Sequence, residues 1–270
     1  MRLRAAKLDA LVSRCERTGL QLDTALRSIM LGPAAGWQAR GLAAKMLSIA
    51  GDNCAANLMD LFFAQTEEIE LWETGLTIEY FGSRAVVRRL TDALHDANPH
   101  RRHAAARALG WIPNDGRRAA KALVGVIADK SQPQPVREQA AESLASLGYA
   151  PAVPTLIDLL DELDVRMRFW AVFALGGIAQ SRMFDHPWRR ADRRVVEALE
   201  KMLADNEAPP GNWWPVGKEA LAMLAHLEPR YREELDPETQ RVLRDPNFSP
   251  DDIRWAEFYG VSKPKNTRHF

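Results

Sequence analysis

The sequence lacks a net charge, long apolar runs and paired cysteines. Lys+Arg and Asp+Glu each number 36, whereas a protein that holds a long stretch of nucleic acid is usually clearly basic. No apolar run approaches the length that spans a membrane. The N-terminus reaches an acidic residue, Asp9, too early for a signal peptide. We therefore expect a cytoplasmic protein without membrane association, and the charge balance argues against a nucleic-acid partner.

Motifs typical of enzymes and metal sites are missing as well. The two cysteines, Cys15 and Cys54, lie in apolar stretches without CxxC spacing, which indicates buried free thiols. None of the six histidines is followed by Glu, and no HxxxH pair suggests zinc. There is no GxGxxG, P-loop or GxSxG motif, and Asp185-His186 is a lone adjacent pair. The sequence thus predicts no catalytic, cofactor-binding or metal-binding residue.

What the sequence does contain is an internal repeat. Segments 102–112, 137–148 and 168–178 each begin with Arg, carry Leu seven residues later, and carry Ile or Leu three residues beyond that. Small residues fill the third and fourth positions after the Arg, apart from Val172. With looser copies included, the Leu or Ile anchor falls at positions 47, 78, 109, 144, 175 and 224, in steps of 31, 31, 35, 31 and 49 residues. A near-constant step of this kind is typical of a repeat protein.

Each repeat predicts a pair of antiparallel helices. If the first Arg is slot 0, the apolar residues at slots 3, 4, 7 and 10 form one stripe of an α-helix, and a second amphipathic segment precedes each such helix. Pro and Gly mark the joints, as in 148–151, and no stretch shows sustained strand alternation. We therefore predict an all-α fold, a right-handed α-solenoid of about six helix-turn-helix repeats.

The predicted boundaries follow from where the repeat begins and ends. They place an N-terminal capping helix at 1–20 and the solenoid at 21–228. An insertion at 180–216 interrupts the last repeat, with irregular stretches at 181–190 and 206–215. A capping segment at 229–260 is expected because an open solenoid end must be covered, and 261–270 would form a flexible tail.

Units of about 31 residues whose second helix reads V-R-x-x-A-A-x-x-L-x-x-[IL]-G resemble HEAT-like repeats, notably the short bacterial subtype first named from phycobilisome bilin lyases. The resemblance is strongest over 85–179 and extends over 21–228. It implies a fold but not a function, because such repeats occur in scaffolds, adaptors, lyases and DNA-repair enzymes. It also implies a ladder of Asp–Arg pairs between repeats. The candidates here are Asp96, Asp129 and Asp164 with Arg102, Arg137 and Arg168.

A binding surface is predicted from the same slots. The second helices of HEAT arrays line the concave face, so slots 1, 2, 5 and 9 should point there or to its margins. Aromatic and arginine side chains concentrate binding energy at interfaces, although large side chains could instead fill a tight superhelix. The predicted concave-face residues are Trp72, Tyr80, His103, Arg107, Trp111, Glu138, Glu142, Phe169, Trp170 and Phe173. The alternative contact residues lie in the loops, where they could also cap the stack: Trp188, Arg189, Arg190, Trp213 and Trp214.

The function predicted from these observations is a non-catalytic scaffold or adaptor that binds another protein or peptide. Two alternatives remain open. One is a bilin-lyase-like enzyme or chaperone that handles a cofactor, which the colour of the purified protein would reveal. The other is a HEAT-repeat DNA-binding or repair protein. That alternative needs a basic groove, and Glu73, Glu138, Glu142 and Glu219 on the proposed inner face argue against it.

Overall fold

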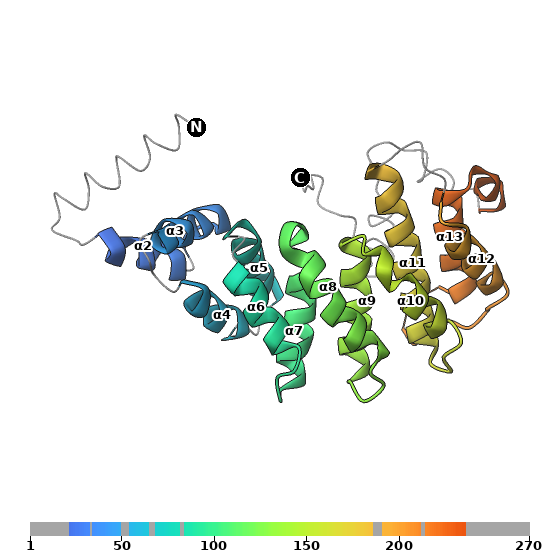
Figure 1. The fold of residues 1–270 in the computed structure, drawn as a ribbon, viewed down its shortest axis with the longest axis horizontal. Coiled ribbons are helices and arrows are strands. Elements are labelled where there is room, and N and C mark those ends of the chain that lie inside the picture. The colour runs from blue at the N-terminus through green and yellow to red at the C-terminus, as the bar shows by residue number, and fades with distance from the viewer. Residues whose placement is uncertain are drawn as a thin grey trace. The chain divides into compact units, whose positions relative to one another are not determined.

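The fold is helical throughout the part of the chain that the structure describes. The structure is a computed structural model, and it describes residues 22–32, 34–49, 54–64, 68–81, 84–185, 191–211 and 214–235. These residues form helices and connecting turns and no strand (Figure 1). The predicted all-α repeat fold is therefore confirmed. Of the helices described, none is long and apolar enough to cross a membrane.

The chain divides into two compact units, Met1–Ala122 (unit 1) and Leu123–Phe270 (unit 2). The division lies inside helix α8, Pro113–Ala128. The predicted N-terminal cap at 1–20, the tail at 261–270 and most of the segment 229–260 lie outside the described residues. The predicted domain boundaries therefore stay predictions.

Unit 1 consists of helical pairs in which second helices pack on second helices and first helices on first helices. Helices α3, α5 and α7 form one layer, since α3 contacts α5 and α5 contacts α7, and α4 contacts α6 in the other layer. The predicted anchors Leu47, Ile78 and Leu109 are each 1 % exposed or less. The helices are α2 (Leu22–Leu31), α3 (Trp37–Ile49), α4 (Cys54–Ala64), α5 (Glu68–Phe81), α6 (Arg84–Ala93) and α7 (Pro99–Gly110).

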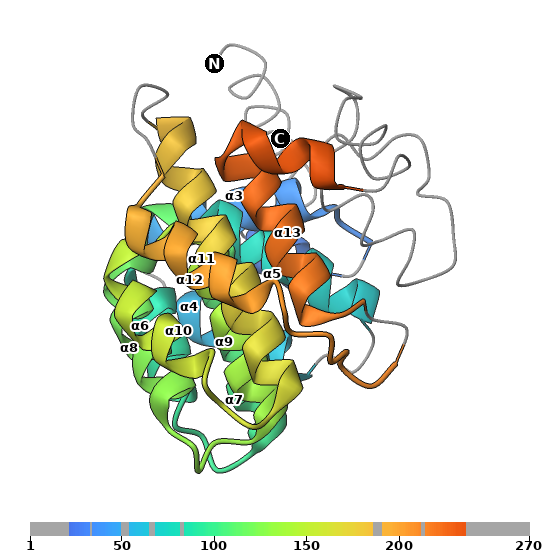
Figure 2. The ribbon, with the colours of Figure 1, turned by 90° about the vertical axis from the view of Figure 1, so that its right-hand side faces the viewer.

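Unit 2 repeats this arrangement with α9, α11 and α13 as the layer of second helices (Figure 1, Figure 2). The anchors Leu144, Leu175 and Leu224 are fully buried. Close packing depends on two glycines of α11, because a Cβ on Gly177 would lie 2.9 Å from the Cβ of Ala145 and one on Gly176 would overlap with Met223. The elements are α9 (Gln134–Ser146), η1 (Ala150–Ala152), α10 (Val153–Leu159), α11 (Val165–Asp185), α12 (Arg193–Met202), α13 (Val216–Leu227) and η2 (Pro229–Glu234).

Helix ends follow the residues at the joints. Asn98 caps α7, where its side chain accepts a hydrogen bond from the backbone N–H of His100 and Pro99 occupies the first helical position. Asp192 caps α12 in the same way. After α9, Gly148 adopts a φ of 58°, and the backbone N–H of Tyr149 then donates to the carbonyl of Leu144. These local signals place each second helix at the predicted register.

One predicted irregular stretch is helical in part. The sequence indicated that 181–190 departs from the repeat, but α11 continues to Asp185. The helix runs on because neither proline nor glycine follows Gly177 before Pro187. The second stretch, 206–215, is non-helical where it is described, in agreement with the prediction.

The slot-0 arginines pair differently from the predicted ladder. Arg137 donates to the backbone carbonyl of Ile127 at 2.8–2.9 Å and to the carboxylate of Glu162 at 2.8–3.1 Å. Arg168 donates to Asp205 and Glu207, at 2.8 Å each. Arg168 also donates to the backbone carbonyls of Glu162 and Leu163, so both arginines join the backbone before their own helix to acidic side chains of the following joint.

The aspartates that the sequence proposed as partners have other roles. The carboxylates of Asp129 and Asp164 accept hydrogen bonds from the backbone N–H groups of Ser131 and Arg166. The carbonyl of Asp96, rather than its carboxylate, accepts a hydrogen bond from Arg102 at 2.8 Å. The predicted pairing is wrong because each of these short carboxylates accepts a hydrogen bond from the backbone N–H two residues further along the chain, as in an Asx turn.

Candidate binding surface on the second helices

The most apolar part of the predicted surface is an aromatic pair on α11. Trp170 and Phe173 are half-buried and meet edge to face, with ring centroids 5.4 Å apart and an interplanar angle of 89°. Residues three apart share one side of a helix, which places both rings on the same face. Phe169 also contacts Trp170 edge to face at 6.1 Å, but it is only 2 % exposed. Phe169 therefore fills the core, and the prediction that it lines the open face is wrong.

Helix α9 borders this pair with carboxylates that are already engaged. Glu138 is 6 % exposed and accepts two hydrogen bonds from Arg166 of α11, at 2.7 and 2.8 Å. The hydrogen bond to Glu138 raises the pKa of the Arg166 guanidinium above its usual value, and the nearby charges of Glu138 and Asp164 add to this effect. Glu142 accepts a hydrogen bond from Gln139 at 2.8 Å. Half-buried Glu142 thus forms a pre-arranged polar edge, whereas Glu138 is buried in its ion pair with Arg166, and the prediction that Glu138 lines the open face is wrong.

Helix α13 borders the pair on its other side with a fixed tryptophan. The indole N–H of Trp214 donates to the carboxylate of Glu219 at 2.7 Å, and Glu219 is fully buried. The ammonium of Lys218 lies 4.7 Å from the centroid of the Trp214 ring. Trp214, predicted as a loop residue, is therefore held against the first turn of α13. The other predicted loop residues lie outside the described residues: Trp188, Arg189, Arg190 and Trp213.

In unit 1, the predicted aromatic residues pack over glycines. Tyr80 covers Gly41 of α3 and also meets Trp37 edge to face at 5.9 Å. Trp111 covers Gly75 of α5 in the same manner. The glycines that receive these rings were not singled out from the sequence. Their signal is a glycine inside a helical repeat, which often marks a close approach by another group.

A cationic side chain also lies over each of these two rings. Lys45 lies 4.2 Å from the centroid of Tyr80, and Arg107 lies 5.3 Å from that of Trp111. Half-buried His103 lies one turn before Arg107, and its pKa is lowered from 6.5 by burial and, secondarily, by the charges of Arg107 and His100. Tyr80 and Trp111 therefore serve helix packing and are also partly accessible.

The predicted concave-face residues thus fall into two sets, one in unit 1 and one in unit 2. Tyr80, His103, Arg107 and Trp111 belong to the first set, while the side chain of Trp72 lies outside the described residues. Glu138, Glu142, Trp170 and Phe173 belong to the second set. The continuity of the two sets stays a prediction.

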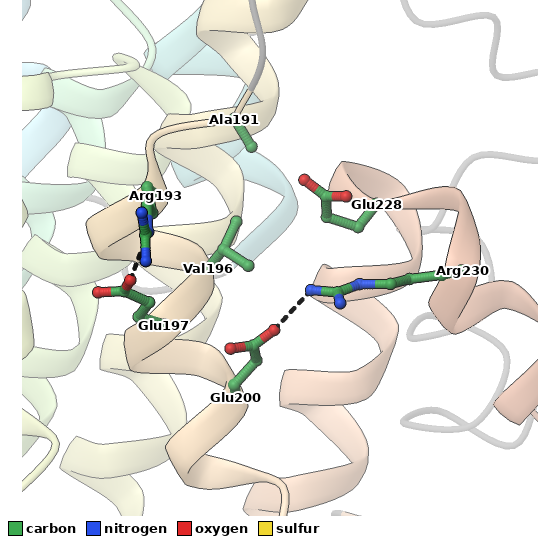
Figure 3. A pocket seen from close by; sticks show the side chains of 7 residues that line it. All are labelled: Ala191, Arg193, Val196, Glu197, Glu200, Glu228 and Arg230. Atoms are coloured by element: carbon green, nitrogen blue, oxygen red, sulfur yellow. Dashed lines mark hydrogen bonds and ion pairs between the residues drawn. The ribbon is translucent and has the colours of Figure 1, made fainter.

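A pocket of about 380 Å³ lies between α12 and the residues after α13 (Figure 3). Its two arginines are already paired, Arg193 with Glu197 at 2.6 Å and Arg230 with Glu200 at 2.8 Å. Glu200 also accepts a hydrogen bond from the hydroxyl of Tyr231, and this bond, together with burial, raises the pKa of Tyr231. Figure 3 shows the Glu228 carboxylate beside Arg230 at the edge of the pocket. The charges of this pocket largely cancel, and none of its residues was predicted as a site.

Candidate metal ligands and free cysteines are few among the residues that the structure describes. Within them, no group of three or more His, Cys, Asp or Glu side chains could hold a metal ion. Cys54 is a buried free thiol, as predicted, and Cys15 lies outside the described residues.

Comparisons with known proteins agree with this architecture. A family model described as HEAT repeats matches residues 56–145 and 127–214, which together span more than half of the chain. No curated protein matches the chain. Among solved structures, the complex of CpcE and CpcF of phycocyanin lyase from Nostoc sp. PCC7120 is 17 % identical, covering 86 % of this chain and 92 % of that chain, with a TM-score of 0.43.

Two artificial proteins are also similar. An engineered protein is 20 % identical, covering 76 % of this chain and 96 % of that chain, with a TM-score of 0.42. A designed armadillo repeat protein is also 20 % identical, covering 77 % of this chain and 93 % of that chain, with a TM-score of 0.38. The repeat anchors, the layered helical pairs and the match to the family model lead to one conclusion: this chain belongs to the HEAT-repeat family.

Proposed function

We propose that this protein is a non-catalytic scaffold or adaptor that binds another protein or peptide through the second-helix face of unit 2. This face comprises those residues at slots 1, 2, 5 and 9 of α9, α11 and α13 that are not buried, and Trp170 and Phe173 form its centre. The supporting observation is a difference between equivalent slots. Where α11 carries Trp170 and Phe173, α9 carries Gln139 and Glu142. Neighbouring helices of the same layer are thus built without aromatic residues at these slots.

The surroundings of the aromatic pair support binding rather than packing. Protein interfaces commonly have an aromatic centre within a polar rim. Here the Glu138–Arg166 pair stands on one side of α11, and Trp214 with Lys218 stands on the other. Both borders are held by hydrogen bonds or ring contacts, so little side-chain freedom would be lost on binding.

The proposal is tested by exchanging the α11 residues for those of α9. The double variant Trp170→Gln, Phe173→Glu imports the α9 residues and should keep the fold. A photoreactive phenylalanine at position 173 should cross-link a partner in an extract of the native host, whereas one at the exposed first-helix position Asp158 should not. Each of Trp170→Ala and Phe173→Ala should weaken binding of that partner by about 1–2 kcal/mol or more.

Stability serves as the second readout. The same variants should lower the melting temperature less than a change at a buried anchor such as Leu144→Ala, because the two rings are only half-buried. Leu163→Gln is the control for non-specific binding through exposed apolar side chains. Leu163 is 99 % exposed and lies in the joint before α11, outside the proposed face. A lower melting temperature with unchanged partner binding would mean that Trp170 and Phe173 are packing residues, and the proposal would fail.

A further inference from the structure

Helix α6 of unit 1 presents three arginines on its outer face. Arg84, Arg88 and Arg89 are exposed, while Val86 and Leu90 on the opposite side are fully buried. Arg84 and Arg88 are four residues apart and therefore follow one another on the same side of the helix. Arg89 extends the cationic surface around the helix, and the three side chains span about 8 Å along its axis.

These three arginines differ from the others in the described part of the chain. Among the arginines whose side chains the structure describes, which excludes Arg117, Arg118 and Arg182, they are the ones for which no hydrogen bond, ion pair or ring contact is found. Arg194 is also exposed, yet it pairs with Asp192 at 2.8 Å, and half-buried Arg101 lies 3.4 Å from Asp96 and over the ring of Phe63 at 4.5 Å. In a chain with no net charge, such unneutralised cations in one place indicate a surface that meets an anionic group.

Helix α12 provides an internal comparison. Its Val195-Val196 pair aligns with Val86-Val87 of α6, so that Arg193 corresponds to Arg84 and Glu197 to Arg88. In α12 the two residues form an ion pair at 2.6 Å. In α6 the same two positions hold like charges, which destabilise an isolated helix slightly. The fold therefore accommodates a neutralised outer face at this position, and α6 departs from it.

We propose that the outer face of α6 binds an acidic peptide segment of a partner protein. This surface belongs to a first helix of unit 1, whereas the face proposed above consists of residues of unit 2. The guanidinium fork matches carboxylates in paired geometry, and two carboxylates four residues apart on a helical peptide match the spacing of Arg84 and Arg88. Exposed Asp92, four residues after Arg88, ends the cationic surface. A nucleic acid needs a longer continuous basic lining, and a peptide of one or two turns does not.

The test uses the full chain and a defined probe. The probe is a fluorescent helical peptide with glutamates four residues apart, and the same peptide with glutamine in place of glutamate is its control. Fluorescence anisotropy at about 0.1 M salt, where charges within about 10 Å still interact, reports binding. The variant Arg84→Gln, Arg88→Gln, Arg89→Gln should weaken binding of the glutamate peptide about tenfold or more. The single variant Arg88→Glu restores the α12 pattern with Arg84, so it should fold and should also lose binding.

A matched variant distinguishes the effect of these three arginines from the effect of a lower net charge. Lys130→Gln, Arg193→Gln, Lys201→Gln removes the same number of exposed cations from unit 2, and it should change the affinity less than about twofold. The proposal is overturned if both triple variants weaken binding equally, or if the native chain does not distinguish the glutamate peptide from the glutamine peptide. Tighter binding of duplex DNA that is lost in the α6 variants would overturn it in favour of a nucleic-acid partner.

Discussion

The indole of Trp111 lies directly over Gly75, so that a side chain at position 75 would overlap with the ring. Trp111 directly follows α7 and Gly75 lies in α5, and these consecutive second helices contact each other. Tyr80 and Gly41 form the same relationship between α5 and α3. An aromatic ring at slot 9 thus packs onto a glycine of the preceding second helix, and the repeat spacing in unit 1 depends on this contact.

The substitution Gly75→Ala should destabilise the protein. A methyl group at this position must displace the Trp111 ring, and overpacking of this kind costs about 1–3 kcal/mol. Urea unfolding measures the change in free energy. Since Trp111→Ala removes the obstacle, the double variant should lose less than the sum of the two single variants.

Gly125→Ala is the matched control. Gly125 lies in the exposed part of α8, and a Cβ there would meet nothing within 4 Å. Because alanine favours a helix over glycine, this change should stabilise the protein by about 0.5–1 kcal/mol. If both glycine variants were stabilised alike, the contact between Trp111 and position 75 would not contribute to the free energy of unfolding.

The anchor register predicts a large difference between two leucines of unit 2. Leu144 is fully buried, whereas Leu163 is 99 % exposed. Leu144→Ala should cost about 2–5 kcal/mol, and Leu163→Ala should cost less than about 0.5 kcal/mol. Thermal and urea unfolding of the two variants compare them directly. A cost below about half a kcal/mol for Leu144→Ala would show that the helical register is wrong.

The features that recur in every repeat could be predicted from the sequence. The six anchors could be predicted because one apolar stripe recurs in each second helix, and each anchor is buried. Slots 3 and 4 behave the same way in the best copies, as Ala140 and Ala141 show. Half-exposed Trp170 and Phe173 also follow from their slots, since neither lies on the buried stripe.

The remaining features depend on contacts between repeats, which a single helix pattern does not contain. Arg137 reaches Glu162 in the next joint, 25 residues away, and no local pattern names that partner. Phe169 occupies an outward slot but is buried. Trp111 was placed near its surface, yet the glycine that receives its ring lies in another repeat.

Arg137 should be essential for stability. Its side chain is 7 % exposed and that of Glu162 is 10 % exposed. Removing the guanidinium takes the main partner from this nearly buried carboxylate, which keeps Lys130 at 3.5 Å, and leaves the carbonyl of Ile127 without its side-chain donor. Arg137→Ala should therefore cost about 3–5 kcal/mol in urea unfolding. Arg193→Ala, in an ion pair whose arginine is 90 % exposed, should cost less than about 0.5 kcal/mol.

A compensating change distinguishes the ion pair from simple loss of packing. If the cost arises from the Glu162 carboxylate that has lost its main partner, the double variant Arg137→Met, Glu162→Leu should recover part of the lost stability. The hydrogen bond from Arg137 lowers the pKa of Glu162 below 4.5, so this pair stabilises the fold above that pH and loses its effect as the pH falls further. Equal instability of the single and double variants would contradict this account.

His103 should make the stability depend on pH in the mildly acidic range. Burial, followed by the charges of Arg107 and His100, lowers its folded pKa below 6.5. The folded state therefore binds this proton less readily than the unfolded state does. The stabilising contribution is fully present above pH 6.5 and is lost as the pH falls through the folded pKa. The unfolding free energy should decrease from neutral pH toward pH 5 (roughly the lower end of the histidine range), and His103→Gln should reduce that slope.

The physical cause can be separated by a second variant. Arg107→Gln removes one of the charges that lower the pKa, so the imidazole of His103 should titrate at a higher pH in this variant, as measured by NMR. Burial remains, so the pKa should stay below 6.5. The acidic groups with lowered pKa values, Asp129 and Glu162, titrate below 3.8 and 4.5 and do not interfere with the range above pH 5. An unchanged slope in His103→Gln would show that another group carries the pH dependence.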